Sequence, residues 1–345
     1  MSRPASTRWQ LLWQGIAIWA GILLSGCRPL GTPPGSPDAY GSFPVPKTVD
    51  IQDNNDKLPY TYHHIRRAIA IREYFEYMDT LVAHFDSLLP YPINEHIIVR
   101  ANPWLIDTLA ATDYYQLMEM GKFIYDPNAI VVLRRGDSLA IPKAEQVEIL
   151  LDRMANTVID VNIPEFKLRI IEQDSTLFTM LVRVGRNETK YLAMAGKEVD
   201  LRTHPGTGKV VRINKDPIFI NPSDNHRYTV TRRDDRRVTK LPRIPWIEME
   251  LDGRRYGQLI HPTTNLETLG KAYSNGCIGT RESDAWRIYY FAPLDTKVVV
   301  RYDLQIEDEN GETILLKDIY PQRFKVAGVW KSADLPSGSS YCDCR

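Results

Sequence analysis

The spacing of apolar residues divides the chain into a helical part followed by a strand-rich part. Over residues 63–89 apolar side chains recur every three or four positions, which predicts an amphipathic helix. A second helix is expected over 102–121, with Asn102 as its N-cap, and a third over 143–154. We therefore expect residues 48–156 to form a helical N-terminal region.

One segment inside this region has a different pattern. Residues 131–142 contain two apolar runs around the turn residues Gly136 and Asp137, which predicts strand, turn and strand. The segment faintly resembles the opening of a LysM glycan-binding repeat, but the match covers only a dozen residues. We expect a plain hairpin packed against the helices.

From residue 158 the apolar period changes to two. Phe166, Leu168 and Ile170 alternate with charged residues, and a returning strand follows over 177–184. Further strands are predicted over 210–213, 218–220, 246–251, 258–260 and 298–302. A single helix is predicted over 282–291, with Thr280 as its N-cap. The fold class is therefore α+β, with a mostly β domain over 157–305 and a C-terminal extension over 306–345.

The N-terminus has the pattern of a secretory signal. Arg3 and Arg8 precede an apolar stretch over 11–24, which is too short to span a bilayer comfortably. The stretch ends in Leu24-Ser25-Gly26-Cys27, which resembles the lipobox of bacterial lipoproteins. The resemblance implies a signal peptide over 1–26 and a mature chain that begins at lipidated Cys27. An uncleaved membrane anchor with a chance cysteine is the alternative.

Residues 27–47 are rich in Pro, Gly and Ser and cannot form a packed element. We expect a semi-extended linker that holds the folded part away from a membrane. The expected location is the cell envelope, with the protein lipid-anchored and facing the periplasm.

Composition narrows the possible partners. Lys plus Arg and Asp plus Glu both number 43, so the formal net charge is zero and nothing points to nucleic acid. The four cysteines form neither a disulfide framework nor a CxxC metal motif. Cys342 and Cys344 lie in a Ser/Gly-rich end, which we expect to be flexible.

The remaining cysteine, Cys277, has the surroundings of a nucleophile. A thiol attacks an amide as a thiolate, which needs a base, and His261 at the end of a predicted strand can supply one. Gly276 permits a tight turn whose N–H groups can form an oxyanion hole. The helix after Thr280 is expected to lower the pKa of the thiol further. Taken singly, Cys277 and His261 are also compatible with ordinary core positions.

The segment from His261 to Ile278 resembles the L,D-transpeptidase (YkuD-type) family. The signature of that family is a His after a strand, a spacer, and then Ser/Thr-His-Gly-Cys-hydrophobic-Arg/Asn. This chain matches it at the following positions: His261, Ser274, Gly276, Cys277 and Ile278. It departs from it at Asn275, where the family has a second histidine, and at Gly279, where it has Arg or Asn. Arg281 is the candidate replacement for that missing cation.

The resemblance implies a mechanism without metal or organic cofactor. Cys277 would attack a peptidoglycan stem tetrapeptide, with His261 as base, and an amine of a neighbouring stem would then take the acyl group in a 3→3 cross-link. The carbonyl of Pro262 would orient His261, while N–H groups around Asn275, Gly276 and Cys277, supported by Ser274, would hold the oxyanion. Carbapenems would be expected to acylate Cys277.

Two alternatives stay open. The acceptor could be water or a protein lysine, which would make the protein an L,D-carboxypeptidase or a protein-anchoring enzyme. The departures at Asn275 and Gly279 would also suit a non-catalytic peptidoglycan-binding lipoprotein.

Overall fold

The structure is a computed structural model that describes residues 61–308 and 310–321. The expected signal peptide, the linker, Cys27, Cys342 and Cys344 lie outside the described residues. None of the helices in the described part is long and apolar enough to cross a membrane.

The N-terminal region contains more and shorter helices than the apolar pattern predicts. They are α1 (Ile71–Asp86), α2 (Glu95–Arg100), α3 (Pro103–Ala110), α4 (Tyr114–Glu119), a 3-10 turn (Pro127–Ala129) and α5 (Ala144–Ala155). The helix predicted over 63–89 is replaced at its start by β1 (Thr61–His64) and β2 (Ile69–Ala70). Asn102 does not cap α3 with its side chain, because its Oδ1 already accepts from the N–H of Ala140 at 2.9 Å.

The hairpin predicted over 131–142 is wrong in its pairing. Its two strands, β3 (Val131–Leu133) and β4 (Ser138–Ile141), do not pair with each other; β3 pairs with β2 and β4 pairs with β1. The turn between them is bonded to Ile65, which accepts from the N–H of Gly136 and donates to the carbonyl of Asp137. The segment that precedes α1 therefore provides the partner for both strands.

The C-terminal part is built on an eight-stranded sheet in the order β19-β17-β16-β11-β20-β5-β6-β7. The strands are β5 (Thr157–Asn162), β6 (Lys167–Glu172), β7 (Ser175–Leu181), β11 (Gly206–Asn214), β16 (Trp246–Leu251), β17 (Leu259–Pro262), β19 (Ile278–Thr280) and β20 (Lys297–Arg301). Only the β5–β20 and β17–β19 pairs are parallel within this sheet. The α+β class, with a helical N-terminal region followed by a mostly β part, is confirmed.

The two edges of the sheet meet. Arg183, two residues after β7, forms a bridge with Gly279 of β19, with N–H to carbonyl distances of 2.9 and 3.0 Å. The next residues form β8 (Val184–Gly185), which pairs with β18 (Ala272–Ser274). This seam brings the chain after β7 against the segment that contains Cys277.

Smaller paired strands decorate the sheet. They are β9 (Thr189–Leu192) with β10 (Lys197–Asp200), β12 (Phe219–Ile220) with β13 (Arg227–Tyr228), β14 (Val230–Arg232) with β15 (Val238–Lys240), and β21 (Gln305–Glu307) with β22 (Thr313–Leu315). A 3-10 turn (Leu266–Thr268) lies in the spacer between His261 and Cys277.

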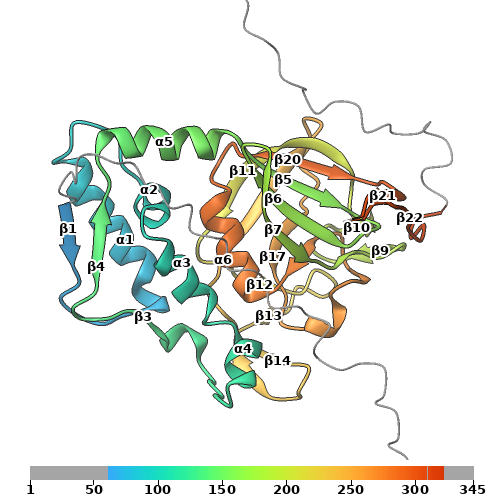
Figure 1. Ribbon diagram of the computed structural model, residues 1–345. Coiled ribbons are helices and arrows are strands. Elements are labelled where there is room, and N and C mark those ends of the chain that lie inside the picture. The colour runs from blue at the N-terminus through green and yellow to red at the C-terminus, as the bar shows by residue number, and fades with distance from the viewer. Residues whose placement is uncertain (1–60, 309, 322–345) are drawn as a thin grey trace, which may run out of the picture. The chain divides into compact units, whose positions relative to one another are not determined.

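Helix α6 (Glu282–Phe291) joins the two parts of the molecule, and its bounds agree with the prediction. Trp286, Tyr289 and Tyr290 pack into the core of the helical region, while Ile288 packs into the core of the sheet. In Figure 1 α6, drawn in orange, lies between α3 and the sheet.

The expected N-cap of α6 is wrong. Arg281, not Thr280, occupies the cap position, and its side chain makes no cap hydrogen bond. The hydroxyl of Thr280 instead donates to the carbonyl of Arg281. The cap comes from the helical region, because Asp113 accepts from the N–H of Ser283 at 3.0 Å.

Candidate active site

His261 and Cys277 lie on neighbouring strands with their side chains on the same face. In the parallel register of β17 and β19, His261 is opposite Gly279 and Ile260 is opposite Ile278. Side chains alternate along a strand, so Cys277, one residue before Ile278, shares the face of Gly279 and His261. Both side chains are partly exposed, and the Cys277 thiol is free.

The His261 ring is held in one orientation and one tautomer. Its Nδ1 lies 2.9 Å from the carbonyl oxygen of Pro262. A carbonyl can only accept, so Nδ1 carries the hydrogen and Nε2 keeps its lone pair. Burial and the charge of Arg183 lower the pKa of His261 to about 4, against a weaker opposing effect of the Pro262 hydrogen bond. The imidazole is therefore neutral at pH 7 and available as a base.

The turn that precedes Cys277 is held by hydrogen bonds from two hydroxyl groups. Ser274 Oγ donates to the carbonyl of Cys277 at 2.6 Å, and Thr203 Oγ1 donates to the carbonyl of Gly276 at 2.9 Å. Gly276 has a φ of +107°, and a Cβ there would lie 2.7 Å from the Nε2 atom of Gln258. A glycine is required at this position for both reasons.

The oxyanion donors differ in part from those expected. The N–H of Gly276 is engaged, because it donates to Ser274 Oγ at 3.2 Å. Among the described residues no acceptor is bonded to the N–H groups of Asn275 and Cys277. Two of the three expected donors are therefore available for a developing negative charge.

The thiol pKa shifts in the direction opposite to the one expected. Burial raises the pKa of Cys277, while the backbone of Leu259 and the charge of Arg183 act weakly in the other direction. The N-terminus of α6 does not provide the expected help, since Asp113 already accepts from its first turn at Ser283. The thiol is thus protonated at pH 7.

The positions that depart from the family signature have partners of their own. Asn275 Oδ1 accepts from Arg186 Nη2 at 2.6 Å. Burial raises the pKa of Asp284 to about 6, and the charges of Arg287 and Arg281 oppose that rise. The cation whose charge acts on Cys277 is Arg183, from the seam of the sheet.

Three further site residues were not found from the sequence. Trp246 packs against His261 with ring centroids 5.0 Å apart, and Gln258 and Thr203 support Gly276. The turn 203–206, a blurred form of a Thr-Pro-x-Gly segment of the family, was the available signal for Thr203. Trp246 lies on β16 and Gln258 directly precedes β17, and the pairing of these strands cannot be derived from local patterns.

Comparison with known families agrees with this geometry. Residues 156–300 match the family model of the L,D-transpeptidase catalytic domain, YkuD. The C-terminal part of the chain is an L,D-transpeptidase domain. No curated protein matches the chain.

Solved L,D-transpeptidases are similar to this chain at low identity. An L,D-transpeptidase in complex with imipenem is 13% identical, with a TM-score of 0.31 over 42% of this chain and 59% of that chain. One from Mycobacterium smegmatis is 15% identical, with a TM-score of 0.30 over 43% and 59%. One from Xylanimonas cellulosilytica is 14% identical, with a TM-score of 0.31 over 69% and 98%. The chain thus spans less than two thirds of the length of the first two.

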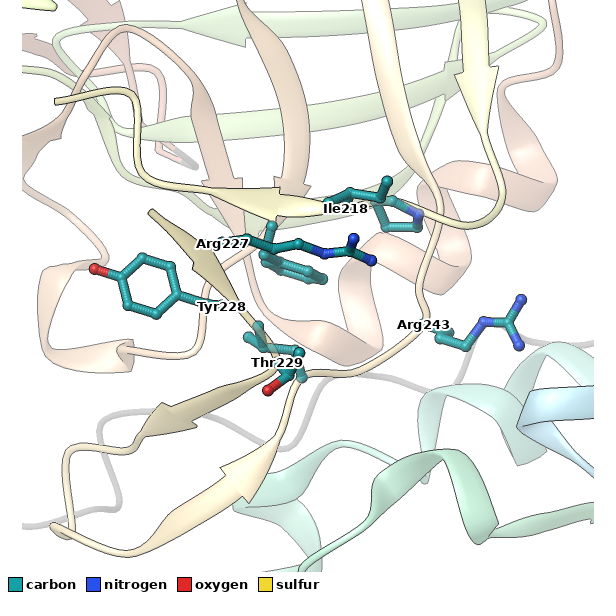
Figure 2. Close-up of a pocket in the computed structure, with 8 residues that line it drawn as sticks. Ile218, Arg227, Tyr228, Thr229 and Arg243 are labelled. Carbon is teal, nitrogen blue, oxygen red and sulfur yellow. The ribbon is translucent and has the colours of Figure 1, made fainter. Parts of the chain in front are cut away.

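The segment 217–243 carries a cavity of about 190 Å³. Figure 2 shows it, with Ile218 and Arg227 close together and the Tyr228 ring directed away from Arg243. Phe219, which also lines it, packs on Trp246 at 4.8 Å, and Trp246 in turn packs on His261. Neither Cys277 nor His261 lines the cavity itself. Within the described ranges no three His, Cys, Asp or Glu side chains gather as metal ligands.

Proposed function

We propose that this chain is an envelope-bound L,D-transpeptidase in which Cys277 is the nucleophile and His261 the base. The observation that carries the proposal is the placement of both side chains on one face of paired strands, with the His261 Nδ1–H bonded to Pro262. That bond leaves Nε2 as the proton acceptor.

The reaction has two balanced halves. The Cys277 sulfur attacks the carbonyl between the third and fourth residues of a stem tetrapeptide, and its proton passes to His261 Nε2. The amide bond breaks, His261 returns the proton to the departing D-alanine, and a thioester remains on the sulfur. An amine of a neighbouring stem then displaces the thiol, which forms the 3→3 cross-link and restores the enzyme. The N–H groups of Asn275 and Cys277 stabilise the oxyanion in both halves.

A mass measurement tests the nucleophile. Incubation with imipenem should add one acyl mass to the wild-type protein and none to Cys277→Ala, and His261→Gln should react far more slowly. Asn275→Ala should be milder than either, because its side chain bonds Arg186 and the oxyanion donor at 275 is backbone. A normal adduct on Cys277→Ala would refute the assignment.

The products separate the transpeptidase from its alternatives. Sacculi incubated with the enzyme should yield 3→3 cross-linked muropeptides. Tripeptides without cross-links would indicate an L,D-carboxypeptidase, and retention on sacculi with an unchanged muropeptide profile would indicate a wall-binding protein.

The proposed anchor is a lipid on Cys27. Cells that express the wild-type chain should incorporate labelled palmitate into it, and Cys27→Ser should abolish the label and release the protein from membranes. Equal labelling of both proteins would rule out this anchor.

A further inference from the structure

A row of side chains crosses the active-site face at the seam of the sheet. Gly279 is opposite His261 on one side and opposite Arg183 on the other. A Cβ at Gly279 would lie 2.4 Å from Arg183 Nε and 2.7 Å from its Cγ. The Arg183 side chain therefore lies over Gly279, in the space that any larger residue at 279 would occupy.

Arg183 lacks the partner that a buried cation ordinarily has. Its Nη1 donates to Thr268 Oγ1 at 3.3 Å, and its Nε is buried with no hydrogen-bond partner. Burial lowers the pKa of Arg183, and the opposing contributions come from Cys277 and Tyr273. Burying a cation without a carboxylate is costly, so the site favours negative charge nearby.

Two other arginines of the strand-rich part have partners of their own. On β11 and β16, Arg212 bonds Glu248 at 2.6 Å. Beside β18, Arg186 bonds Asn275 and lies 3.6 Å from Glu188. His261 on β17 is neutral. Among the described residues, Arg183 is the cation beside the thiol that has no carboxylate partner.

We propose that Arg183, seated over Gly279, is the positioning residue that stabilises negative charge on the Cys277 sulfur and on the tetrahedral intermediate. This inference rests on the proposed function and names the source of its electrostatic assistance. When the Cys277 proton passes to His261 Nε2, the guanidinium attracts the thiolate and repels the imidazolium. That repulsion makes His261 a stronger acid towards the departing amine. Because Gly279 has no side chain, the guanidinium of Arg183 can occupy this space beside Cys277.

The test measures ionisation of the thiol separately from turnover. Alkylation by iodoacetamide from pH 6 to 10, followed by digestion and the mass of the peptide that contains Cys277, reports the pKa of that thiol without any need for substrate and separately from the other three cysteines. Arg183→Met should raise that pKa by about one unit and should slow acylation by imipenem roughly 10- to 100-fold. Arg183→Lys should show a smaller rise of the thiol pKa and a smaller loss of acylation rate. Arg255→Met, which removes an exposed cation of similar size, is the matched control.

Moving the cation provides the sharper test. Gly279→Arg alone should impair acylation, because two side chains then compete for one space. The double variant Arg183→Ala/Gly279→Arg should react at least tenfold faster than Arg183→Ala, since the cation returns from the other strand. Melting curves identify variants that do not fold. If Arg183→Met does not fold, Arg183→Lys and the double variant provide the test instead.

The outcomes separate the two proposals. An unchanged alkylation profile in a folded Arg183→Met protein, or no gain in the double variant, overturns the role of Arg183 even if the wild-type enzyme forms cross-links. A wild-type protein that is alkylated normally but yields no muropeptide product overturns the proposed function. In that case the shift of the thiol pKa in Arg183→Met still decides the role of Arg183.

Discussion

At the residue scale, the site rests as a neutral thiol beside a neutral imidazole. Burial acts in opposite senses on the two groups: it raises the pKa of Cys277 and lowers that of His261. Both shifts favour the uncharged form, so the proton moves only as the attack proceeds. This differs from a preformed thiolate–imidazolium pair.

The pH dependence of acylation follows from these directions. Because His261 stays unprotonated down to about pH 4, the acid limb should have its midpoint near that value and not near 6.5. Because burial raises the pKa of the Cys277 thiol above its ordinary value, the plateau should extend into the alkaline range. Imipenem acylation followed by stopped-flow absorbance checks this. An acid midpoint near 6.5 would instead contradict the lowered pKa of His261.

The residues proposed for the chemistry could be singled out from the sequence because they are close together in it. His261, Ser274, Gly276 and Cys277 belong to one segment whose spacing is informative. Arg183 could not be found in this way, because its contact with Gly279 depends on closure of the sheet by chain far from the motif. The candidate at 281 was the nearest cation in sequence and not in space.

At the scale of elements, Asp113 serves two helices at once. Its Oδ1 accepts from the N–H of Tyr115 in α4 at 2.9 Å, and its Oδ2 accepts from Ser283 in α6 at 3.0 Å. Asp113→Ala should therefore lower the free energy of unfolding by about 1–3 kcal/mol. Urea unfolding followed by circular dichroism measures it. Asp107→Ala, at an exposed position of α3, should change it little, and equal losses would contradict the double cap.

The segment after β20 braces the nucleophile turn. Tyr320 is fully buried; its hydroxyl donates to the carbonyl of Gly185 at 2.5 Å and accepts from the N–H of Thr203 at 3.2 Å. Tyr320→Phe leaves both groups unsatisfied and should cost about 1–3 kcal/mol of stability. Tyr228→Phe, at an exposed ring, is the control. Equal decreases of the denaturant midpoint in both variants would show that the Tyr320 hydrogen bonds do not stabilise the fold.

Element prediction succeeded where the pattern was local and long enough. The period-two run of β16 and the helical run of α6 were predicted with the bounds that they have, although the cap of α6 was not. The six-residue helix α2 was missed because it is shorter than two turns. The pairing of β3 and β4 was wrong since register depends on which distant strand lies alongside.

At the scale of the whole molecule, the helical region and the L,D-transpeptidase domain share their interior. Glu95 of α2 accepts from the hydroxyls of Tyr289 and Tyr290, at 3.1 and 2.8 Å, and from Lys215 at 2.7 Å. Arg233 and Glu282 form a fully buried pair at 2.5 Å. Removal of one partner of such a pair typically costs about 3–5 kcal/mol.

The catalytic domain should accordingly not fold alone. A fragment 156–321 would expose Trp286, Tyr289 and Tyr290 and leave Glu282 and Ser283 without Tyr114 and Asp113. We expect it to be aggregated or to lack a cooperative melting transition, whereas 61–321 should melt cooperatively. Scanning calorimetry and size-exclusion chromatography of the two proteins compare them. A monomeric, cooperatively melting short fragment would show that the shared interior is dispensable.

The brace at Tyr320 has a consequence for biosynthesis. Ribosomes deliver a polypeptide from its amino end, so Thr203 and Gly185 emerge long before the tyrosine that bonds them. Until Tyr320 is present, Gly185 and Thr203 beside the Cys277 turn lack the hydrogen bonds of its hydroxyl. The reactive centre thus matures among the last steps of chain delivery, and an unfinished or prematurely terminated product is left without a finished nucleophile.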